Sequence, residues 1–243
     1  ASGAPAYIMA VAAIDTTTLV AVGYSHTTAS SNQGIVYRST DAGVSWTLVY
    51  SSSAVYTSFR SVIAVSPTIL VAAGGTYTAT SNFYSVIYRS TDAGLSWSLV
   101  YTSGVLGGFN GVAKLSNTVL IAVGADGADP TTVKPAIYRS TDGGLTWANV
   151  YTRSGGTEAY GTLYDVIALS ETELVAVGSS TSSNFAIVYR SDNSGATWHI
   201  AYTSEAYGLL VGVTKISDTV LVATGTNASN FGVVYRSEDA GLT

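Results

Sequence analysis

Short apolar runs alternate with polar turns along the whole chain. In one representative stretch, an apolar run over residues 59–65 is followed by a turn and a second run over residues 70–74. After a polar loop come residues 86–89, a tight Asp-x-Gly turn, and residues 97–101. The runs are rich in Val, Ile, Tyr and Trp and are separated by Gly, Ser, Thr, Asn and Asp, which is typical of strands and turns. No window shows the 3.6-residue periodicity of a helix, so the pattern predicts an all-β chain.

The same strand pattern returns about every 50 residues. The segment 37–46 recurs three times, with Asn193 in place of an aspartate in the last of these copies, at residues 88–97, 138–147 and 189–198. A fifth copy begins at Tyr235 and ends one residue before the position of its tryptophan. A second signature, a short apolar run that ends in glycine, occurs at Gly23, Gly74, Gly124, Gly178 and Gly225. Five copies of one supersecondary unit are therefore expected.

Four antiparallel strands repeated five times predict a single domain, a five-bladed β-propeller. A solenoid is the alternative, but nothing in the sequence resembles a polar capping repeat at either end. The last blade lacks sequence for its outer strand, so we expect an exposed edge there, or a longer chain that continues past Thr243. The repeats span roughly residues 1–51, 52–102, 103–152, 153–203 and 204–243.

Closure of the ring predicts a particular strand pairing. We expect the first and last segments to share one sheet. Residues 6–14 would form its innermost strand beside residues 19–23, and residues 233–237 would form its third strand.

The repeated pattern Ser-x-Asp-x-Gly-x-Ser/Thr-Trp resembles the Asp-box, also called the bacterial neuraminidase repeat. This motif occurs in propellers such as sialidases, sortilin-type receptors, some xyloglucanases and photosystem assembly factors. The resemblance implies that each box is the turn between the third and fourth strands, on the face opposite the usual active site. The carboxylate is expected to accept backbone N–H bonds, the glycine to supply a positive φ, and the tryptophan to pack between blades. The residues with this structural role are Asp41, Asp92, Asp142, Asn193, Asp239, Trp46, Trp97, Trp147 and Trp198. The repeated arginines are expected to be partners of that turn, namely Arg38, Arg89, Arg139, Arg190 and Arg236.

Composition excludes several classes of function. Only 10% of the residues are charged, against roughly 25% in an ordinary soluble domain. With a net charge of −5, no nucleic-acid partner is expected. Cysteine is absent, which excludes disulfides, thiolate metal sites and cysteine nucleophiles, and no metal or other cofactor is expected. The longest apolar run, residues 6–14, is too short for membrane insertion. Few lysines and many Ser, Thr and Tyr favour an extracellular or surface-exposed setting.

Enzymatic function can be tested by asking which catalytic residue types remain once the residues of the repeated motif are set aside. Removing the five repeated arginines from the seven in the chain leaves Arg60 and Arg153, so the arginine triad of a sialidase cannot be built. Glycosidases need a pair of carboxylates, but the inner strands carry only Asp165 at the aligned position, where the other repeats have Ala10, Ser61, Gly111 and Gly212. Glu158 and Glu205 on nearby loops leave a glycosidase open as a further alternative.

The residues that differ between repeats indicate a binding face. Eight of the seventeen tyrosines lie outside the repeat motif, in or beside the loops that should emerge opposite the Asp-boxes. One position of the first strand differs in every repeat, as Met9, Arg60, Asn110, Tyr164 and Val211. We predict a ligand near the mouth of the central channel, with Arg60, Asn110, Tyr164 and Asp165 as polar contacts. The stacking walls would be Tyr56, Tyr77, Tyr84, Tyr160 and Tyr207.

This chemistry favours a non-catalytic, lectin-like module that binds a glycan, because sugar rings stack on aromatic side chains and bond to amides. The alternative is a structural or assembly module of an extracellular or virion surface, whose partner is a protein surface or another copy of the chain. The same aromatics could also do no more than cover the bases of the loops.

Overall fold

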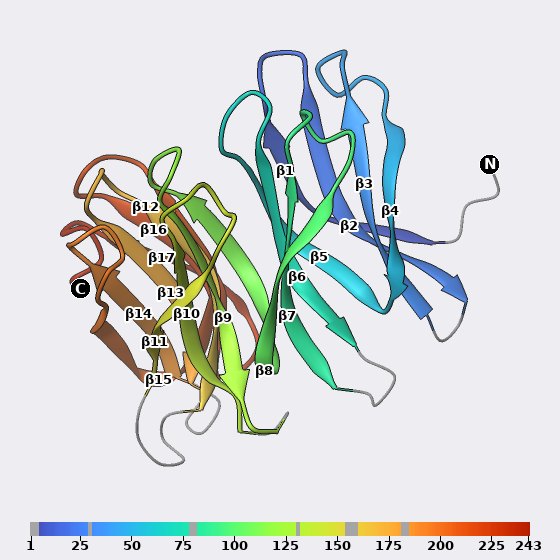
Figure 1. The fold of residues 1–243 in the computed structure, drawn as a ribbon. Helices are drawn as coiled ribbons and strands as arrows, with labels where there is room; N and C mark the ends of the chain where they lie inside the picture. Colours follow the sequence, from blue (N-terminus) through green and yellow to red (C-terminus); the bar gives the residue numbers. More distant parts are fainter. Residues whose placement is uncertain (1–4, 29–30, 78–81, 130–131, 154–159, 181–184) are drawn as a thin grey trace.

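The computed structural model describes residues 5–28, 31–77, 82–129, 132–153, 160–180 and 185–243 (Figure 1). The all-β expectation is confirmed for this part of the chain. Within it, no helix is long and apolar enough to cross a membrane. The strands are β1 (Ala6–Ala13), β2 (Leu19–Thr28), β3 (Ser31–Ser39), β4 (Thr47–Val55), β5 (Thr57–Ala64), β6 (Leu70–Tyr77), β7 (Phe83–Ser90), β8 (Ser98–Lys114), β9 (Leu120–Gly127), β10 (Lys134–Ser140), β11 (Ala148–Thr152), β12 (Gly161–Ala168), β13 (Leu174–Ser180), β14 (Phe185–Ser191), β15 (His199–Lys215), β16 (Leu221–Asn227) and β17 (Gly232–Ser237).

The strands form three antiparallel sheets, with the orders β1-β2-β3-β4, β11-β10-β9-β8-β7-β6-β5 and β12-β13-β14-β15-β16-β17. The long strands β8 and β15 each serve two sequence repeats. The start of β8 pairs with β7, where Ser98 lies opposite Arg89, and its end pairs with β9, where Lys114 lies opposite Leu120. Strand β15 does the same between β14 and β16. Each of the first four repeats therefore supplies four neighbouring strands, and the last supplies three.

The glycine at the end of each apolar run in the second strand is required by close backbone approach. A Cβ atom built on Gly74 would lie 2.0 Å from the carbonyl oxygen of Ser58. A Cβ on Gly124 would lie 2.0 Å from the carbonyl oxygen of Gly108. Since atoms cannot approach so closely, no other residue fits at this position, which accounts for the five-fold recurrence of glycine.

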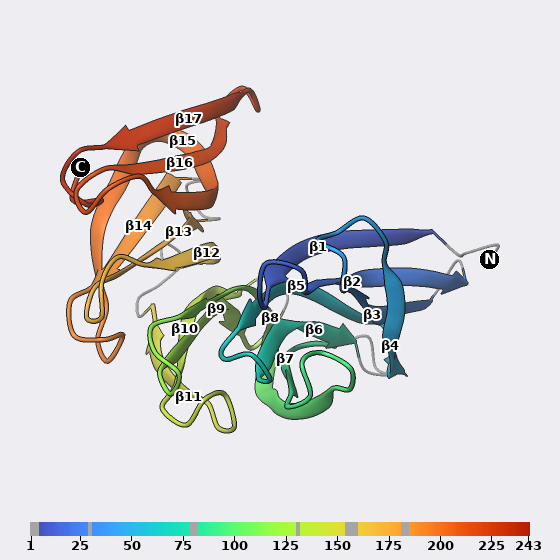
Figure 2. The ribbon, with the colours of Figure 1, turned by 90° about the horizontal axis from the view of Figure 1, so that it is seen from above.

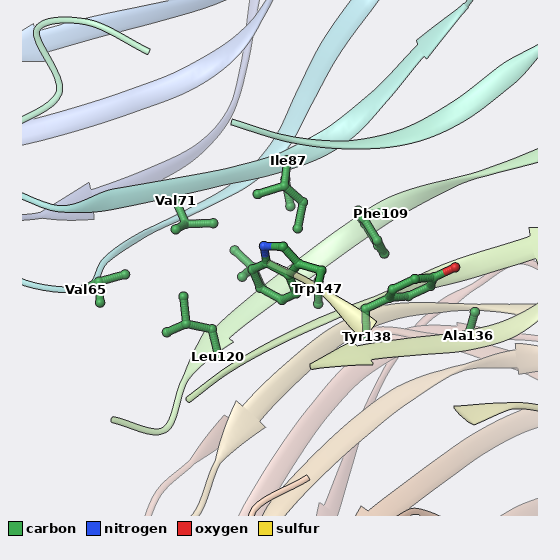
Figure 3. Packing of buried hydrophobic residues seen from close by; sticks show 11 residues of the cluster. Val65, Val71, Ile87, Phe109, Leu120, Ala136, Tyr138 and Trp147 are labelled. Atoms are coloured by element: carbon green, nitrogen blue, oxygen red, sulfur yellow. The ribbon is translucent and has the colours of Figure 1, made fainter. Parts of the chain in front are cut away.

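The hydrophobic core lies between successive repeats. In the cluster of Figure 3, Trp147 packs with Val71 and Ile87 of the preceding repeat and with Leu120 and Tyr138 of its own. The equivalent places in two further clusters are taken by Trp97 and Trp198. These three indoles are only 6%, 8% and 7% exposed, in the order Trp97, Trp147 and Trp198, so each repeat anchors itself on the one before it.

The repeated Ser-x-Asp-x-Gly turns, called Asp-boxes here for their resemblance to that motif, have the expected internal bonding. In the second repeat, Asp92 Oδ1 accepts hydrogen bonds from the backbone N–H of Ser96 (2.9 Å) and from the hydroxyl of Ser90 (2.7 Å). Its Oδ2 accepts the hydroxyl of Ser96 (2.5 Å). These bonds hold the pKa of Asp92 below its usual value, although burial opposes them. The same backbone bond recurs from Ser45 to Asp41, Thr146 to Asp142, Thr197 to Asn193 and Thr243 to Asp239.

The repeated arginines connect each repeat to the turn of the next one. Arg38 Nε donates to the carbonyl oxygen of Ala93 (3.0 Å), in the Asp-box turn of the second repeat. The same bond runs from Arg89 to Gly143 (2.9 Å) and from Arg139 to Ser194 (2.9 Å), and Arg190 Nη1 donates to Ala240 (2.5 Å). The arginines are thus partners of a turn, as expected, but of the turn in the following repeat.

The first and last repeats do not share a sheet. In Figure 2 the strands β1 and β17 lie at separate places, and in the described part of the chain β1 pairs with β2 alone and β17 with β16 alone. The predicted pairing of residues 6–14 with residues 19–23 is confirmed by the β1–β2 ladder. The prediction that residues 233–237 form the third strand of that sheet is wrong. The free edge of β2 is taken by β3 of the same repeat, which reaches it through a short connection.

The outer face of the first repeat is consequently open. Ile8 and Val11 are 51% and 59% exposed, whereas Phe59 and Val62, at the same positions of the second repeat, are 0% and 6% exposed. Trp46 is 38% exposed for the same reason.

Replacing Trp97 by alanine should lower the free energy of unfolding by about 3–5 kcal/mol, because a buried indole and its packing are lost. Trp46→Ala is the matched control, since it removes the same residue of the same motif from the outer face of the first repeat, which no other described repeat covers. Its cost should be well under half as large. Urea titration followed by circular dichroism measures both, and equal costs would contradict the inter-repeat role of the tryptophan.

Replacing Asp92 by alanine should cost about 1–3 kcal/mol of stability, because the N–H of Ser96 and the two serine hydroxyls lose their acceptor. Asp192→Ala removes an exposed carboxylate three positions ahead of Gly195 and should change stability by less than about 0.5 kcal/mol. A thermal melt of the two variants distinguishes them, and a silent Asp92→Ala would refute the structural role of the box.

Candidate functional site

The variable position of the first strand coincides with a β-bulge. The register between the first and second strands shifts between Phe59 and Ser61 and again between Phe109 and Gly111. Arg60 and Asn110 therefore occupy bulges, and Met9, Tyr164 and Val211 do so in the other repeats. A bulge leaves one residue outside the ladder and re-aims its side chain. Residue type at this point of the inner strand is therefore free of the pairing pattern.

Polar side chains at and beside these bulges link successive repeats. Arg60 Nη1 donates to Asn110 Oδ1 (2.6 Å), and Asn110 Nδ2 donates to the carbonyl oxygen of Leu163 (2.7 Å). Asp165 Oδ2 accepts the N–H of Val213 (2.9 Å) across the next boundary, and its Oδ1 accepts the adjoining N–H of Val166 (2.8 Å). Burial raises the pKa of Asp165 above its usual value against the effect of those two bonds. Both carboxylate oxygens of Asp165 are therefore engaged in structural bonds.

A cavity of about 270 Å³ lies beside the Arg60–Asn110 pair. Tyr77 and Phe83 form its aromatic wall, with their ring centroids 4.6 Å apart. The guanidinium carbon of Arg60 lies 5.2 Å from the centroid of Phe83, a cation–π distance. The remaining lining comes from Leu106, Gly107, Gly108, Ala125, Val133 and Thr162.

Phe83 is held in this wall by two glycines. A Cβ atom on Gly75 would lie 2.1 Å from the ring of Phe83, and one on Gly108 would lie 2.5 Å from it. Any side chain at either position would displace the ring. The position of Phe83 in the aromatic wall therefore depends on the absence of a side chain at these two glycines. Tyr56 extends the wall by an edge contact with Tyr77, with the ring centroids 6.4 Å apart.

Arg60 is a cation without a carboxylate partner in the part of the chain that the structure describes. Burial lowers its pKa from the usual value, and the phenols of Tyr77, Tyr164 and Tyr24 act in the opposite direction. Withdrawing a guanidinium from water without a counter-charge is unfavourable. Oxygen atoms of a ligand in the cavity would offset that cost.

The predicted site residues divide among several places. Arg60, Asn110 and Tyr77 line the cavity, Tyr56 contacts Tyr77, and Tyr164 lies near Arg60. The other predicted side chains are not among the cavity's lining residues. Tyr84 lies opposite Leu106 in the β7–β8 ladder, and Tyr160 borders a second cavity. Tyr207 packs on Phe185 with ring centroids 5.9 Å apart, and Asp165 links β12 to β15.

The second cavity, of about 550 Å³, contains a buried carboxylate that the sequence analysis did not select. Asp126 is 6% exposed, and its Oδ2 accepts the hydroxyl of Tyr138 (2.6 Å) and the amide of Asn149 (3.2 Å). Its Oδ1 has no hydrogen-bond partner in the described structure. Burial raises the pKa of Asp126 above the usual value. Lys134 Nζ lies over the ring of Tyr160 at 6.0 Å in the same cavity.

Sequence reasoning also missed Phe83 as a wall residue, although it selected the loop that contains it. The available signal was the repeated Ser-Asn-Phe of residues 81–83, 183–185 and 229–231. Phe231 is 68% exposed at the last of these positions, so the motif alone does not say which phenylalanine borders a cavity.

No family model matches the chain, and no curated protein matches it in sequence. Solved structures do match it in fold. A GH74 enzyme from Niastella koreensis superposes with a TM-score of 0.64 at 15% identity, over 96% of this chain and 37% of that one. A protein of unknown function from Dyadobacter fermentans gives 0.66 at 14% identity, over 97% and 80%. The Hadza microbial sialidase gives 0.64 at 17% identity, over 94% and 52%.

The chain thus spans well under half the length of the first of these proteins, and about half of the sialidase. At such low identity the likeness establishes the fold alone. Together with the antiparallel sheets of four to seven strands, it shows that this chain has an all-β, propeller-like fold.

Proposed function

We propose that the protein is a non-catalytic carbohydrate-binding module and that the cavity beside Arg60 and Asn110 holds one sugar unit. The observation that carries the proposal is the combination of an aromatic wall, Tyr77 and Phe83, with a guanidinium that has no ion pair among the described residues. The aliphatic face of a sugar ring packs on aromatic rings, and its oxygen atoms accept hydrogen bonds from a cation. An extracellular or surface-exposed setting belongs to the same proposal.

The polar geometry supports a ligand that accepts hydrogen bonds. Asn110 already uses its Oδ1 on Arg60 and its Nδ2 on Leu163. Among the described residues, Arg60 donates from Nη1 alone, to Asn110, and a guanidinium has five N–H groups. The guanidinium is therefore the principal donor toward a ligand. A hydroxyl or a carboxylate of an acidic sugar would each serve as acceptor.

Binding without hydrolysis is supported by the lining of the cavity. Glycoside hydrolysis needs two carboxyl groups on either side of the scissile bond, and the residues that line this cavity include no Asp or Glu. Both carboxylate oxygens of Asp165 accept hydrogen bonds from backbone N–H groups. Glu205 borders a different cavity. Glu158, kept open above as a glycosidase candidate, lies outside the described residues. The fold-level likeness to a sialidase is compatible with a sugar ligand without implying its activity.

Tyr77→Ala should weaken glycan binding by about ten-fold or more, because the stacking wall is removed. Tyr77 is 47% exposed, so stability should change by no more than about 1 kcal/mol. Tyr207→Ala is the matched control, because Tyr207 is 57% exposed and packs on Phe185 instead. An array of neutral and acidic glycans identifies the ligand, and calorimetry then compares the variants. A blank array, or equal affinity of the two variants, would overturn the proposal.

A second candidate function is an assembly module, and the open faces of the end repeats favour it. Ile8 and Val11 at one end and Val234 at the other are 51%, 59% and 70% exposed. Apolar surfaces of this kind mark interfaces. Light scattering across a concentration series should then show self-association that Val11→Asp abolishes. A strictly monomeric protein would rule out self-assembly through these faces.

A further inference from the structure

The third repeat carries polar side chains that its neighbours replace by other residue types. Asn149 lies opposite the motif tyrosine, Tyr138, in the β10–β11 ladder. The residues opposite that tyrosine in three other repeats are apolar, namely Leu48, Leu99 and Ile200. Asp126 is the second residue after the glycine of the second strand, where the other repeats have Ser25, Thr76, Ser180 and Asn227. The common fold therefore forms without a carboxylate or an amide at these two positions.

The two residues specific to the third repeat bond to each other. Asn149 Nδ2 donates to Asp126 Oδ2 (3.2 Å), and the same oxygen accepts the hydroxyl of Tyr138 (2.6 Å). Asn149 Nδ2 also donates to Thr152 Oγ1 (2.9 Å). Bonds from two strands thus hold the carboxylate of Asp126 in one orientation.

The carboxylate of Asp126 is paired on one side only. Its side chain lines the cavity of about 550 Å³ described above, and the residue is only 6% exposed. Its Oδ1 has no hydrogen-bond partner in the described structure. Buried polar atoms in native proteins are nearly always bonded, and leaving one unpaired is unfavourable. A hydrogen-bond donor brought into the cavity by a ligand would remove that cost.

The rest of the cavity lining indicates the class of ligand. Lys134 lies directly opposite Asp126 in the β9–β10 ladder, and its ammonium group can only donate hydrogen bonds, whereas an ionised carboxylate can only accept them. These are the two charged residues among the described residues of the lining, and their charges cancel. A neutral ligand with groups that both donate and accept is therefore favoured over an ion. The hydroxyls of Thr132 and Thr152 and the ring of Tyr160 complete a surface suited to a sugar.

We propose that the cavity at Asp126 is a second binding site, which takes a neutral sugar unit. A hydroxyl of the sugar donates to Asp126, a second hydroxyl accepts from Lys134, and the sugar ring packs beside Tyr160. The inference goes beyond the proposed function, because it stands on its own lining and does not require the cavity at Arg60 to bind a ligand.

The two cavities lie on opposite faces of the same strands. In β9, Ala125 lines the cavity at Arg60 and Asp126 lines the second one. In β8, Leu106 and Val105 divide between the two cavities in the same way. Because successive residues of a strand point to opposite faces, a ligand in one cavity does not fill the other. The two sites are therefore expected to bind independently and to differ in preference.

The test of the ligand class uses the intact, isotope-labelled protein and the methyl glycosides of glucose, galactose and mannose at tens of millimolar. Amide shifts in nuclear magnetic resonance should be saturable for at least one of them and should include Asp126, Lys134 and Asn149. The amino-sugar and uronic-acid relatives of that sugar should bind at least about ten-fold more weakly, because each adds a charge to a balanced cavity. No shift at these residues, or tighter binding of a charged relative, would overturn the proposal.

Variants copied from other repeats locate the site. Asp126→Thr combined with Asn149→Leu installs the residues found at Thr76 and Leu99, so the fold should persist, and sugar binding should weaken by about ten-fold or more. Lys134→Gln copies Gln33, which lies at the same ladder position, and leaves the bonds of Asp126 in place. It should weaken binding several-fold. Leu99→Ala is the control, since it changes a half-exposed residue of the second repeat, and it should bind normally.

The alternative, in which Asp126 serves the fold alone, makes the opposite prediction. The double variant would then lower the melting temperature and bind the sugar as the original protein does, and Lys134→Gln would bind unchanged. Either binding result would refute the second site. Tyr77→Ala separates this proposal from the proposed function, because it removes the wall of the cavity at Arg60 and should leave the shifts at Asp126 intact. Loss of those shifts in Tyr77→Ala would place the sugar in the cavity at Arg60 and refute the second site while the proposed function stands.

Discussion

The contact that each repeat makes with the one before it is the interaction on which the rest of the structure depends. A single repeat is a small antiparallel sheet with two apolar faces, and it cannot bury either of them alone. The tryptophan of each box packs into the preceding repeat, and the arginine of each repeat bonds to the turn of the next. Apolar packing and a directional hydrogen bond therefore both fix the orientation of one repeat on the next. The low content of charged residues follows, since most surfaces of a central repeat are covered.

The same contact determines where the chain can vary. Positions in the ladders and at the repeat boundaries are constrained by packing, as the 2.0 Å approach at Gly74 illustrates. A bulged residue is free of the ladder, and the side chains differ there from repeat to repeat. Arg60 and Asn110 at two such bulges bond to one another across a repeat boundary. The candidate sugar site thus includes a hydrogen bond that joins two repeats, and this bond holds the guanidinium of Arg60 in a fixed position.

The sugar cavity depends on what two repeats add to the common plan. The second repeat supplies Arg60, Tyr77 and Phe83, and the third supplies Asn110, which bonds to Arg60. A polar group is thereby placed against aromatic rings at the boundary between the two repeats.

Strands, turns and the roles of the repeated residues follow from the sequence by itself, because they rest on local alternation and on motifs whose bonds close within four or five residues. The bonds of Asp92 to Ser90 and Ser96 are of this kind. Only the tertiary structure decided which aromatic residues meet. Tyr77 at the end of β6 and Tyr207 in β15 are both half-exposed tyrosines outside the repeat motif, yet one borders the cavity and the other packs on Phe185. The tertiary structure also decided that the first and last repeats do not share a sheet. Both depend on the orientation of successive repeats, which is the sum of many long-range contacts, and no single motif encodes it.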